Sequence, residues 1–151
     1  MMKDCDILLV EDNPDDVELT LLAFEENKIC NNMPVVRDGE EALDYLFGTG
    51  KHAGRDVSKL PSVILLDLKL PKIDGLDVLK RIRSEPATEF LPVIILTSSK
   101  DDEDVMHSYS LGANAYVRKP VDYAQFAEAA KTLGLFWLVL NQPPPVRRAR
   151  T

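Results

Sequence analysis

The chain has 151 residues, the length of one ordinary domain, and a hydrophobic content of 45% that suffices for a single core. Acidic residues outnumber basic residues by 25 to 18, and the net charge of -7 disfavours binding to the polyanionic backbone of nucleic acids. The longest apolar run, residues 133–140, is far shorter than the roughly 20 residues of a membrane-spanning helix, so a soluble protein is expected.

Short apolar runs alternate with segments of helical periodicity along the chain. The runs predict strands at residues 5–10, 33–36, 62–67, 92–97 and 114–119. This alternation is typical of an α/β fold. We expect a doubly wound, five-stranded parallel sheet of the flavodoxin-like type, with strand order 2-1-3-4-5, five helices and an extended fifth helix. Three of the runs are apolar nearly throughout, as central strands covered on both faces should be.

Capping signals mark several helix starts. Asp38 with Glu41, and Asp122 with Gln125, have capping-box spacing, and Pro14 suits the first turn of a helix. Apolar residues mark the third helix at Leu76, Leu79 and Ile82, and the fourth at Val105, Met106 and Tyr109. The Gly-rich segment 48–61 predicts a long loop before the third strand. A solvated face is predicted for the scattered basic residues Lys69, Lys72, Lys80, Arg81 and Arg83.

The cysteines Cys5 and Cys30 are isolated from each other and from His52 and His107. This spacing fits neither a disulfide framework nor a zinc site. We therefore expect buried, reduced thiols in a cytoplasmic protein. Neither histidine has a metal-ligand or nucleophile partner in the sequence, so neither is assigned a function.

Polar side chains lie at the carboxyl ends of four of the five predicted strands. Glu11 and Asp12 come after the first strand, Asp67 ends the third, Thr97 the fourth and Lys119 the fifth. Ligands of doubly wound sheets bind beyond the carboxyl ends of the strands, so these side chains are expected to converge. Three acids held close together repel one another, so unless one of them is protonated they require a cation, and their oxygen ligands suit Mg²⁺. The pattern predicts a site for a divalent metal and an anionic group.

The same residues resemble those of the receiver domains of two-component response regulators. That family has an acidic pair after the first strand, and an aspartate followed at fixed spacing by a proline and a glycine. It also has a hydroxyl residue ending the fourth strand, and an aromatic residue shortly before a Lys-Pro pair. The matching residues are Glu11, Asp12, Asp67, Pro71, Gly75, Thr97, Tyr116, Lys119 and Pro120. The resemblance extends over residues 4 to 130 or so.

The resemblance implies that Asp67 accepts a phosphoryl group from a phosphohistidine of a sensor histidine kinase. It also implies that Mg²⁺ is bound by Asp12, Asp67 and the backbone carbonyl of Lys69, with Glu11 acting through water. Lys69 departs from the small or amide residue common at its position, but its carbonyl remains available to a metal. A phosphoacceptor signalling protein of this kind is not an enzyme in the ordinary sense.

Further roles follow from the resemblance. The ammonium group of Lys119 and the hydroxyl group of Thr97 are expected to contact phosphoryl oxygens. Thr97 and Tyr116 are the candidates for a two-state switch that alters the surface of the fourth helix, fifth strand and fifth helix. A cis peptide bond is expected between Lys119 and Pro120.

Three alternative functions compete with this interpretation. A phosphatase of the haloacid dehalogenase type also forms an aspartyl phosphate, but it requires a second acid at the position of Lys69. A flavodoxin-like flavin binder requires a Ser/Thr-rich phosphate loop where residues 11–16 are acidic. A degenerate receiver that only binds partners is excluded by the intact acidic and lysine positions.

The predicted receiver domain comprises residues 1–134, and residues 135–151 form a helix extension and a Pro-rich tail. This remainder is too short for an output domain, so the output is expected to be another protein. The insertion 48–61 and the end of the chain resemble the single-domain response regulators of bacterial and cyanobacterial phytochrome histidine kinases. A phytochrome-like kinase is therefore the expected partner.

The continuation of the fifth helix is apolar all round, which usually marks an interface. We expect a homodimer formed through the fourth helix, fifth strand and extended fifth helix, with Phe136 and Trp137 as central anchors. The alternative is that the segment folds back over its own core.

Overall fold

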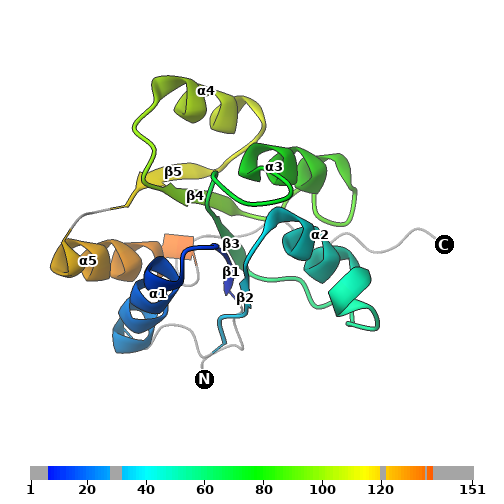
Figure 1. The fold of residues 1–151 in the computed structure, drawn as a ribbon, viewed down its shortest axis with the longest axis horizontal. Helices are drawn as coiled ribbons and strands as arrows, with labels where there is room; N and C mark the ends of the chain where they lie inside the picture. Colours follow the sequence, from blue (N-terminus) through cyan, green and yellow to red (C-terminus); the bar gives the residue numbers. More distant parts are fainter. Residues whose placement is uncertain (1–6, 28–31, 120–121, 135, 138–151) are drawn as a thin grey trace.

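The computed structural model describes residues 7–27, 32–119, 122–134 and 136–137. A single sheet of five parallel strands runs through the molecule in the order β2-β1-β3-β4-β5 (Figure 1). The strands are β1 (Ile7–Val10), β2 (Val35–Val36), β3 (Val63–Leu66), β4 (Val93–Thr97) and β5 (Ala115–Arg118). The predicted fold class and strand order are confirmed.

A helix follows each strand. The helices are α1 (Pro14–Asn27), α2 (Gly39–Phe47), α3 (Gly75–Ser84), α4 (Asp102–Ser110) and α5 (Tyr123–Gly134). The predicted loop 48–61 contains one turn of 3-10 helix, η1 (Gly50–His52). Among the helices that the structure describes, none has both the length and the apolar character required to cross a membrane. Pro120, with its expected cis bond, and most of the expected extension of α5 lie outside the described residues.

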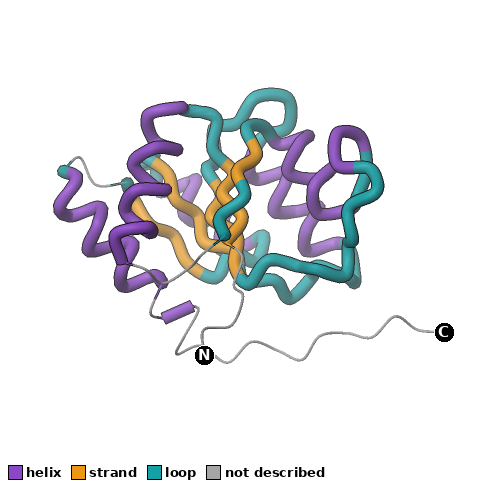
Figure 2. Tube along the Cα trace, turned by 90° about the horizontal axis from the view of Figure 1, so that it is seen from below, coloured by secondary structure: helices purple, strands orange, loops and turns teal. Residues whose placement is uncertain are grey.

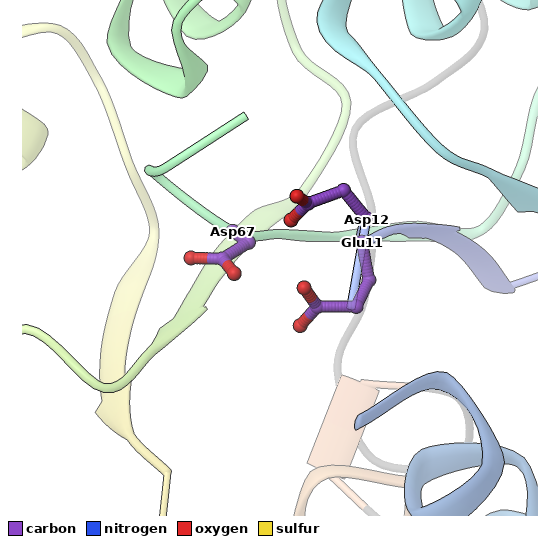
Figure 3. Close-up of side chains that lie close together, drawn as sticks. All are labelled: Glu11, Asp12 and Asp67. Atoms are coloured by element: carbon purple, nitrogen blue, oxygen red, sulfur yellow. The ribbon is translucent and has the colours of Figure 1, made fainter. Parts of the chain in front are cut away.

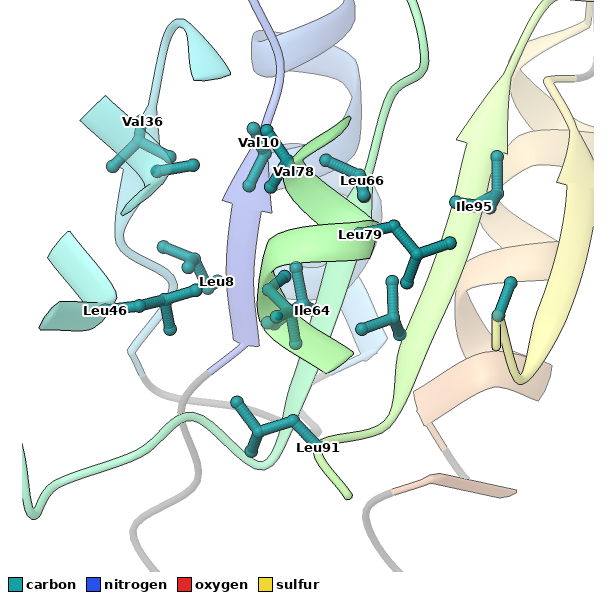
Figure 4. Close-up of a cluster of buried hydrophobic side chains, with 14 of the residues drawn as sticks. Leu8, Val10, Val36, Leu46, Ile64, Leu66, Val78, Leu79, Leu91 and Ile95 are labelled. Atoms are coloured by element: carbon teal, nitrogen blue, oxygen red, sulfur yellow. The ribbon is translucent and has the colours of Figure 1, made fainter. Parts of the chain in front are cut away.

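The sheet lies between two layers of helices. Helices α1 and α5 cover one face, and α2 and α3 cover the other, with α4 beyond α3 (Figures 1 and 2). Every residue of β1, β3 and β4 is buried, which confirms that the three apolar runs are the central strands. Because side chains alternate across a strand, these strands supply two separate cores. Figure 4 shows the larger core, where Leu8, Ile64 and Ile95 of the sheet meet Leu46 of α2 and Leu79 of α3.

The observed helix caps match the caps predicted from the sequence in part. The side chain of Asp38 accepts a hydrogen bond from the backbone N–H of Glu41 at 2.7 Å, as predicted. The carboxylate of Glu41 accepts from the N–H of Arg37, one residue before the expected partner. Asp122 accepts from the N–H of Ala124, so α5 begins with a local aspartate turn instead of the predicted capping box.

The fourth helix is present, but two of its apolar side chains, Met106 and Tyr109, do not face the core. Met106 is 70% exposed and Tyr109 is 51% exposed, whereas Ser108 is the only buried residue of α4. The helix packs beside the edge strand β5, where little of the sheet remains to be covered. Met106 and Tyr109 therefore belong to the surface of the molecule.

The prediction of a solvated face was wrong for Arg83 at the end of α3. Its guanidinium group is partly buried and donates to the carbonyls of Leu91 at 2.7 Å, Gly112 at 2.9 Å and Glu89 at 3.0 Å. It also donates to Oδ1 of Asn114 at 2.9 Å. Arg83 thus ties the end of α3 to the segments that precede β4 and β5.

Candidate functional site

The backbone of the sheet fixes the two acids that follow β1 and β3. Val10 pairs with Leu66 at the end of the two strands. The N–H of Asp67 donates to the carbonyl of Val10 at 3.1 Å, and the N–H of Glu11 donates to the carbonyl of Val36 at 3.0 Å. Both acids are therefore held by a continuation of the sheet's own hydrogen bonds.

Three carboxylates meet at this edge of the sheet. Glu11, Asp12 and Asp67 each offer an oxygen, and these oxygens lie within 4.8 Å of one another (Figure 3). Glu11 is 2% exposed and Asp67 is 8% exposed, whereas Asp12 faces solvent. The structure thus brings together the three acids that the sequence predicted to converge.

Lys119 reaches the same edge from the end of β5. Its N–H donates to the carbonyl of Thr97 at 2.8 Å, which continues the pairing of β5 with β4. Its Nζ donates to Oδ2 of Asp67 at 3.2 Å, to Oδ2 of Asp16 at 2.9 Å and to Oε1 of Glu11. The side chain is 9% exposed. The sequence predicted the nearness of Lys119 to Glu11 and Asp67 but missed Asp16.

Burial and neighbouring charges shift the pKa values of Glu11 and Lys119 in this cluster. Burial raises the pKa of Glu11 to about 7, and the neighbouring Asp67 adds to the rise, while Lys119 opposes it. Burial alone would lower the pKa of Lys119, but its hydrogen bonds to Glu11 and Asp16 and the charge of Asp67 outweigh burial and raise it. Lys119 is therefore a permanent positive charge beside a crowded set of acids.

The loop between β3 and α3 passes close to Asp67. The N–H of Gly75 donates to the carbonyl of Leu68 at 2.9 Å, and a Cβ at Gly75 would overlap the carbonyl oxygen of Asp67. The N–H of Lys69 lies 3.4 Å from Oδ1 of Asp67 and donates to it. Gly75 is therefore required by close packing of the backbone, and metal binding by the carbonyl of Lys69 stays a prediction.

The predicted switch residues are connected through the loop after β4. Thr97 is buried, and its Oγ1 accepts from the N–H of Ser99 at 3.4 Å. The hydroxyl of Tyr116 donates to the carbonyl of Ser99 at 3.3 Å, and burial raises the pKa of that hydroxyl. The hydroxyl of Ser99 in turn donates to Asp104 of α4 at 2.7 Å. The sequence did not indicate that Ser99 links these residues to α4.

The two predicted dimer anchors have different surroundings. The rings of Phe136 and Trp137 make an edge-to-face contact with centroids 5.0 Å apart. Trp137 packs against the core between the sheet and helices α1 and α5, whereas Phe136 is 47% exposed. The packing of Trp137 against its own chain agrees in part with the alternative that this segment folds back over the core. The side chain of Phe136 remains accessible to solvent.

The acid cluster fits the predicted metal. All three donors are carboxylate oxygens, which Mg²⁺ and Mn²⁺ prefer and softer metals do not. Asp12 is the exposed member, so the cluster is accessible from solvent. The adjacent ammonium of Lys119 and hydroxyl of Thr97 are donors suited to an anion.

Comparison with known proteins agrees with this site. Residues 7–131 match the family described as the response regulator receiver domain. Response regulator Rcp1 of Synechocystis sp. is 36% identical over 132 residues, which are 87% of this chain and 88% of Rcp1. The crystal structure of the Mn²⁺-bound form of Rcp1 has a TM-score of 0.84 and 33% identity, covering 93% of this chain and 99% of that chain.

Two further solved structures are similar over most of their length. The phosphorylated cyanobacterial phytochrome response regulator RcpA has a TM-score of 0.87 and 37% identity, covering 95% of this chain and 100% of that chain. The bacteriophytochrome response regulator RtBRR has a TM-score of 0.75 and 53% identity, covering 95% of this chain and 86% of that chain. These matches do not support the haloacid dehalogenase alternative. The chain belongs to the family of response regulator receiver domains.

Proposed function

We propose that this protein accepts a phosphoryl group on Asp67 from a phosphohistidine of a sensor histidine kinase. The observation that carries the proposal is the position of Asp67, rigid at the end of a buried strand between two other acids and Lys119. A receiver domain acts in phosphoacceptor signalling, and Asp67 is held by its backbone N–H to Val10 and by its side chain to Lys119 and to the N–H of Lys69.

In the proposed reaction, a carboxylate oxygen of Asp67 attacks the phosphorus atom in line with the bond to the histidine nitrogen. The new O–P bond forms as the P–N bond breaks. The electron pair of the broken bond stays on the imidazole, which is neutral or takes a proton from solvent. Lys119 and Thr97 stabilise the transferred group by donating to its oxygens.

Asp12, Asp67 and the carbonyl of Lys69 are the proposed ligands of Mg²⁺, with Glu11 acting through water. When bound, the cation supplies positive charge that offsets the repulsion between the carboxylates and the phosphoryl oxygens. The Mn²⁺-bound structure of Rcp1 and the cluster of carboxylates in this chain support a divalent cation here.

The proposed output is a two-state switch. Movement of Thr97 toward the phosphoryl group would break its contact with Ser99, and Ser99 also binds Tyr116 and Asp104 of α4. A change at Asp67 would thereby shift the equilibrium between two surfaces of α4 and β5. The protein is proposed to signal in this way in the cytoplasm, with at most self-catalysed phosphorylation and dephosphorylation.

The proposed kinase is of the phytochrome type, because RcpA and RtBRR are named as phytochrome response regulators. We also propose that residues 1–134 form the receiver unit and that residues 135–151 extend it. The family match over residues 7–131 supports the proposed receiver unit. A homodimer through α4, β5 and the segment after α5 is supported by the exposed side chains of Met106, Tyr109 and Phe136.

Phosphotransfer from purified kinases tests this function. A phytochrome-type histidine kinase, labelled on its histidine by autophosphorylation with radioactive ATP, is mixed with the protein and Mg²⁺. Label should pass within seconds to the wild-type protein and not to Asp67→Asn. An osmosensing or chemotaxis kinase should transfer more slowly. Equal transfer to Asp67→Asn would refute Asp67 as the phosphoacceptor. Faster transfer from the other kinases would refute a phytochrome-type kinase as the partner.

A further inference from the structure

Asp16 contacts the site but is not one of its expected members. It lies in the first turns of α1, and its N–H donates to Oδ1 of Asn13 at 3.2 Å. Its Oδ2 accepts a hydrogen bond from Nζ of Lys119 at 2.9 Å, shorter than the 3.2 Å between Nζ and Asp67. Among the described residues, the carboxylates grouped closely enough to share a metal are Glu11, Asp12 and Asp67, and the side chain of Asp16 contacts Lys119 instead.

The ammonium of Lys119 has three hydrogens, and three carboxylates already accept from it. A phosphoryl group on Asp67 would remove the charge of that carboxylate and add oxygens that are themselves negatively charged, and these oxygens would compete with Glu11 and Asp16 for the donors of Lys119. The side chain of Asp16 is 35% exposed, against 3% for Glu11 and 10% for Asp67. Water can hydrate Asp16 after its release, whereas release of Glu11 would leave a buried charge unpaired. Of these two carboxylates, Asp16 is therefore the one that Lys119 can leave at the lower cost in free energy.

The charge of Asp16 has opposite effects on the two species expected at the site. Its negative charge attracts a divalent cation bound to the neighbouring acids and repels the oxygens of a phosphoryl group. Its hydrogen bond also occupies the donor of Lys119 that the phosphoryl group needs. A residue that merely supported the local fold would influence both species in the same direction.

We propose that Asp16 is a positioning residue, which holds the ammonium of Lys119 on the α1 side of the site and competes with the phosphoryl group for it. The inference rests on the proposed function, because it assigns a role to Asp16 in that reaction. Transfer of Lys119 from Asp16 to the phosphoryl group would also remove a link between α1 and the end of β5. The phosphorylated state would then differ from the resting state at α1.

The test compares Asp16→Asn with wild type, with Asp15→Asn as the matched control. Asp15 is the preceding residue, is exposed and carries the same charge, and its N–H is held by the same Asn13 side chain. Titration calorimetry measures the affinity for Mg²⁺ alone, and then for beryllofluoride, a phosphoryl mimic, at saturating Mg²⁺. Asp16→Glu, which keeps the charge and can still reach Lys119, is the rescue variant.

For Asp16→Asn we expect Mg²⁺ affinity to fall and beryllofluoride affinity to rise, each by roughly two- to fivefold. Asp15→Asn should change either affinity by less than about 1.5-fold, since an exposed charge is screened. Asp16→Glu should resemble wild type. Affinities for Mg²⁺ and beryllofluoride that fall together, or that change equally in Asp15→Asn, would overturn the role of Asp16. A wild-type protein that binds neither probe would instead overturn the proposed function and this inference with it.

Discussion

Nζ of Lys119 lies 3.2 Å from Oδ2 of Asp67, although the two residues are separated by 52 positions in the chain. The strand order places β4 between β3 and β5, so the lysine must cross the end of β4 to reach the acid. It does so with a side chain that is 9% exposed. The site therefore contains a fixed positive charge next to the proposed nucleophile before any ligand binds.

The hydroxyl of Thr97 should contribute to phosphorylation beyond its role in packing. Thr97→Val preserves the volume of this buried side chain but removes the donor, so labelling by acetyl phosphate should slow by roughly 10- to 100-fold. Thr97→Ser retains the hydroxyl and should slow labelling far less. Stopped-flow or quenched labelling at saturating Mg²⁺ measures both rates. Equal rates for the valine and serine variants would show that the hydroxyl has no part in the reaction.

Glu11 should make the metal-free protein less stable as the pH rises. The pKa of Glu11 is raised from 4.5 to about 7 in the folded protein, mainly by burial. Between these values the folded state binds more protons than the unfolded state, so the free energy of unfolding falls with increasing pH. The loss should amount to roughly 1–3 kcal/mol between pH 5 and 7 in EDTA.

Urea denaturation at pH 5, 6 and 7 measures this loss. Glu11→Gln cannot titrate at this position, so its free energy of unfolding should depend less on pH over the same range. The contributions of groups remote from Glu11 cancel in the comparison. Parallel pH profiles for the two proteins would contradict the raised pKa of Glu11.

Arg83 should stabilise the fold more than its neighbour Arg81, although both are basic residues of α3. Arg83→Lys loses the planar fork that reaches several carbonyls, and should lower the free energy of unfolding by about 2–3 kcal/mol. Arg81→Lys disturbs an exposed ion pair with Glu85 and should cost less than about 0.5 kcal/mol. Chemical denaturation of both variants gives the comparison, and similar costs would disprove the role of Arg83.

Phe136 should support dimer formation. Phe136→Ser should weaken self-association by roughly tenfold or more, since an exposed aromatic at the proposed interface would be lost. Phe90→Ser is the matched control, because Phe90 is exposed to 52% at a distant point in the chain and is outside the proposed interface. Sedimentation velocity at tens of micromolar detects the difference. A wild-type protein that remains monomeric would contradict the proposed dimer, and two variants that associate equally would contradict the role of Phe136.

The central strands and the acid cluster were predictable from the sequence because both depend on local pattern. An apolar run such as 63–66 must be covered on both faces, and the parallel order then brings Glu11, Asp67 and Lys119 to one edge. Each of these residues directly follows a strand, so its position in the fold depends on topology alone. No information on side-chain packing was needed to predict that they meet.

Contacts that depend on side-chain direction were not predictable. Asp16 meets Lys119 across 103 positions, and nothing in the acidic segment 11–16 distinguishes it from Asp15. Likewise, helical spacing does not reveal that Arg83 points inward while Arg81 lies at the surface. The apolar residues of α4 predicted the helix correctly, but they did not reveal that Met106 and Tyr109 lie at the surface, because at the edge of the sheet apolar spacing does not require burial.

Mapping of the phosphorylated residue tests whether Asp67 is the phosphoacceptor and whether the reaction needs Mg²⁺. The protein is incubated with acetyl phosphate in Mg²⁺ or in EDTA, and the modified residue is located by borohydride reduction and mass spectrometry. We expect one phosphoryl group, on Asp67, in Mg²⁺ and essentially none in EDTA or in Asp67→Asn. Labelling that persists in EDTA, or that remains at the wild-type level in Asp67→Asn, would contradict it.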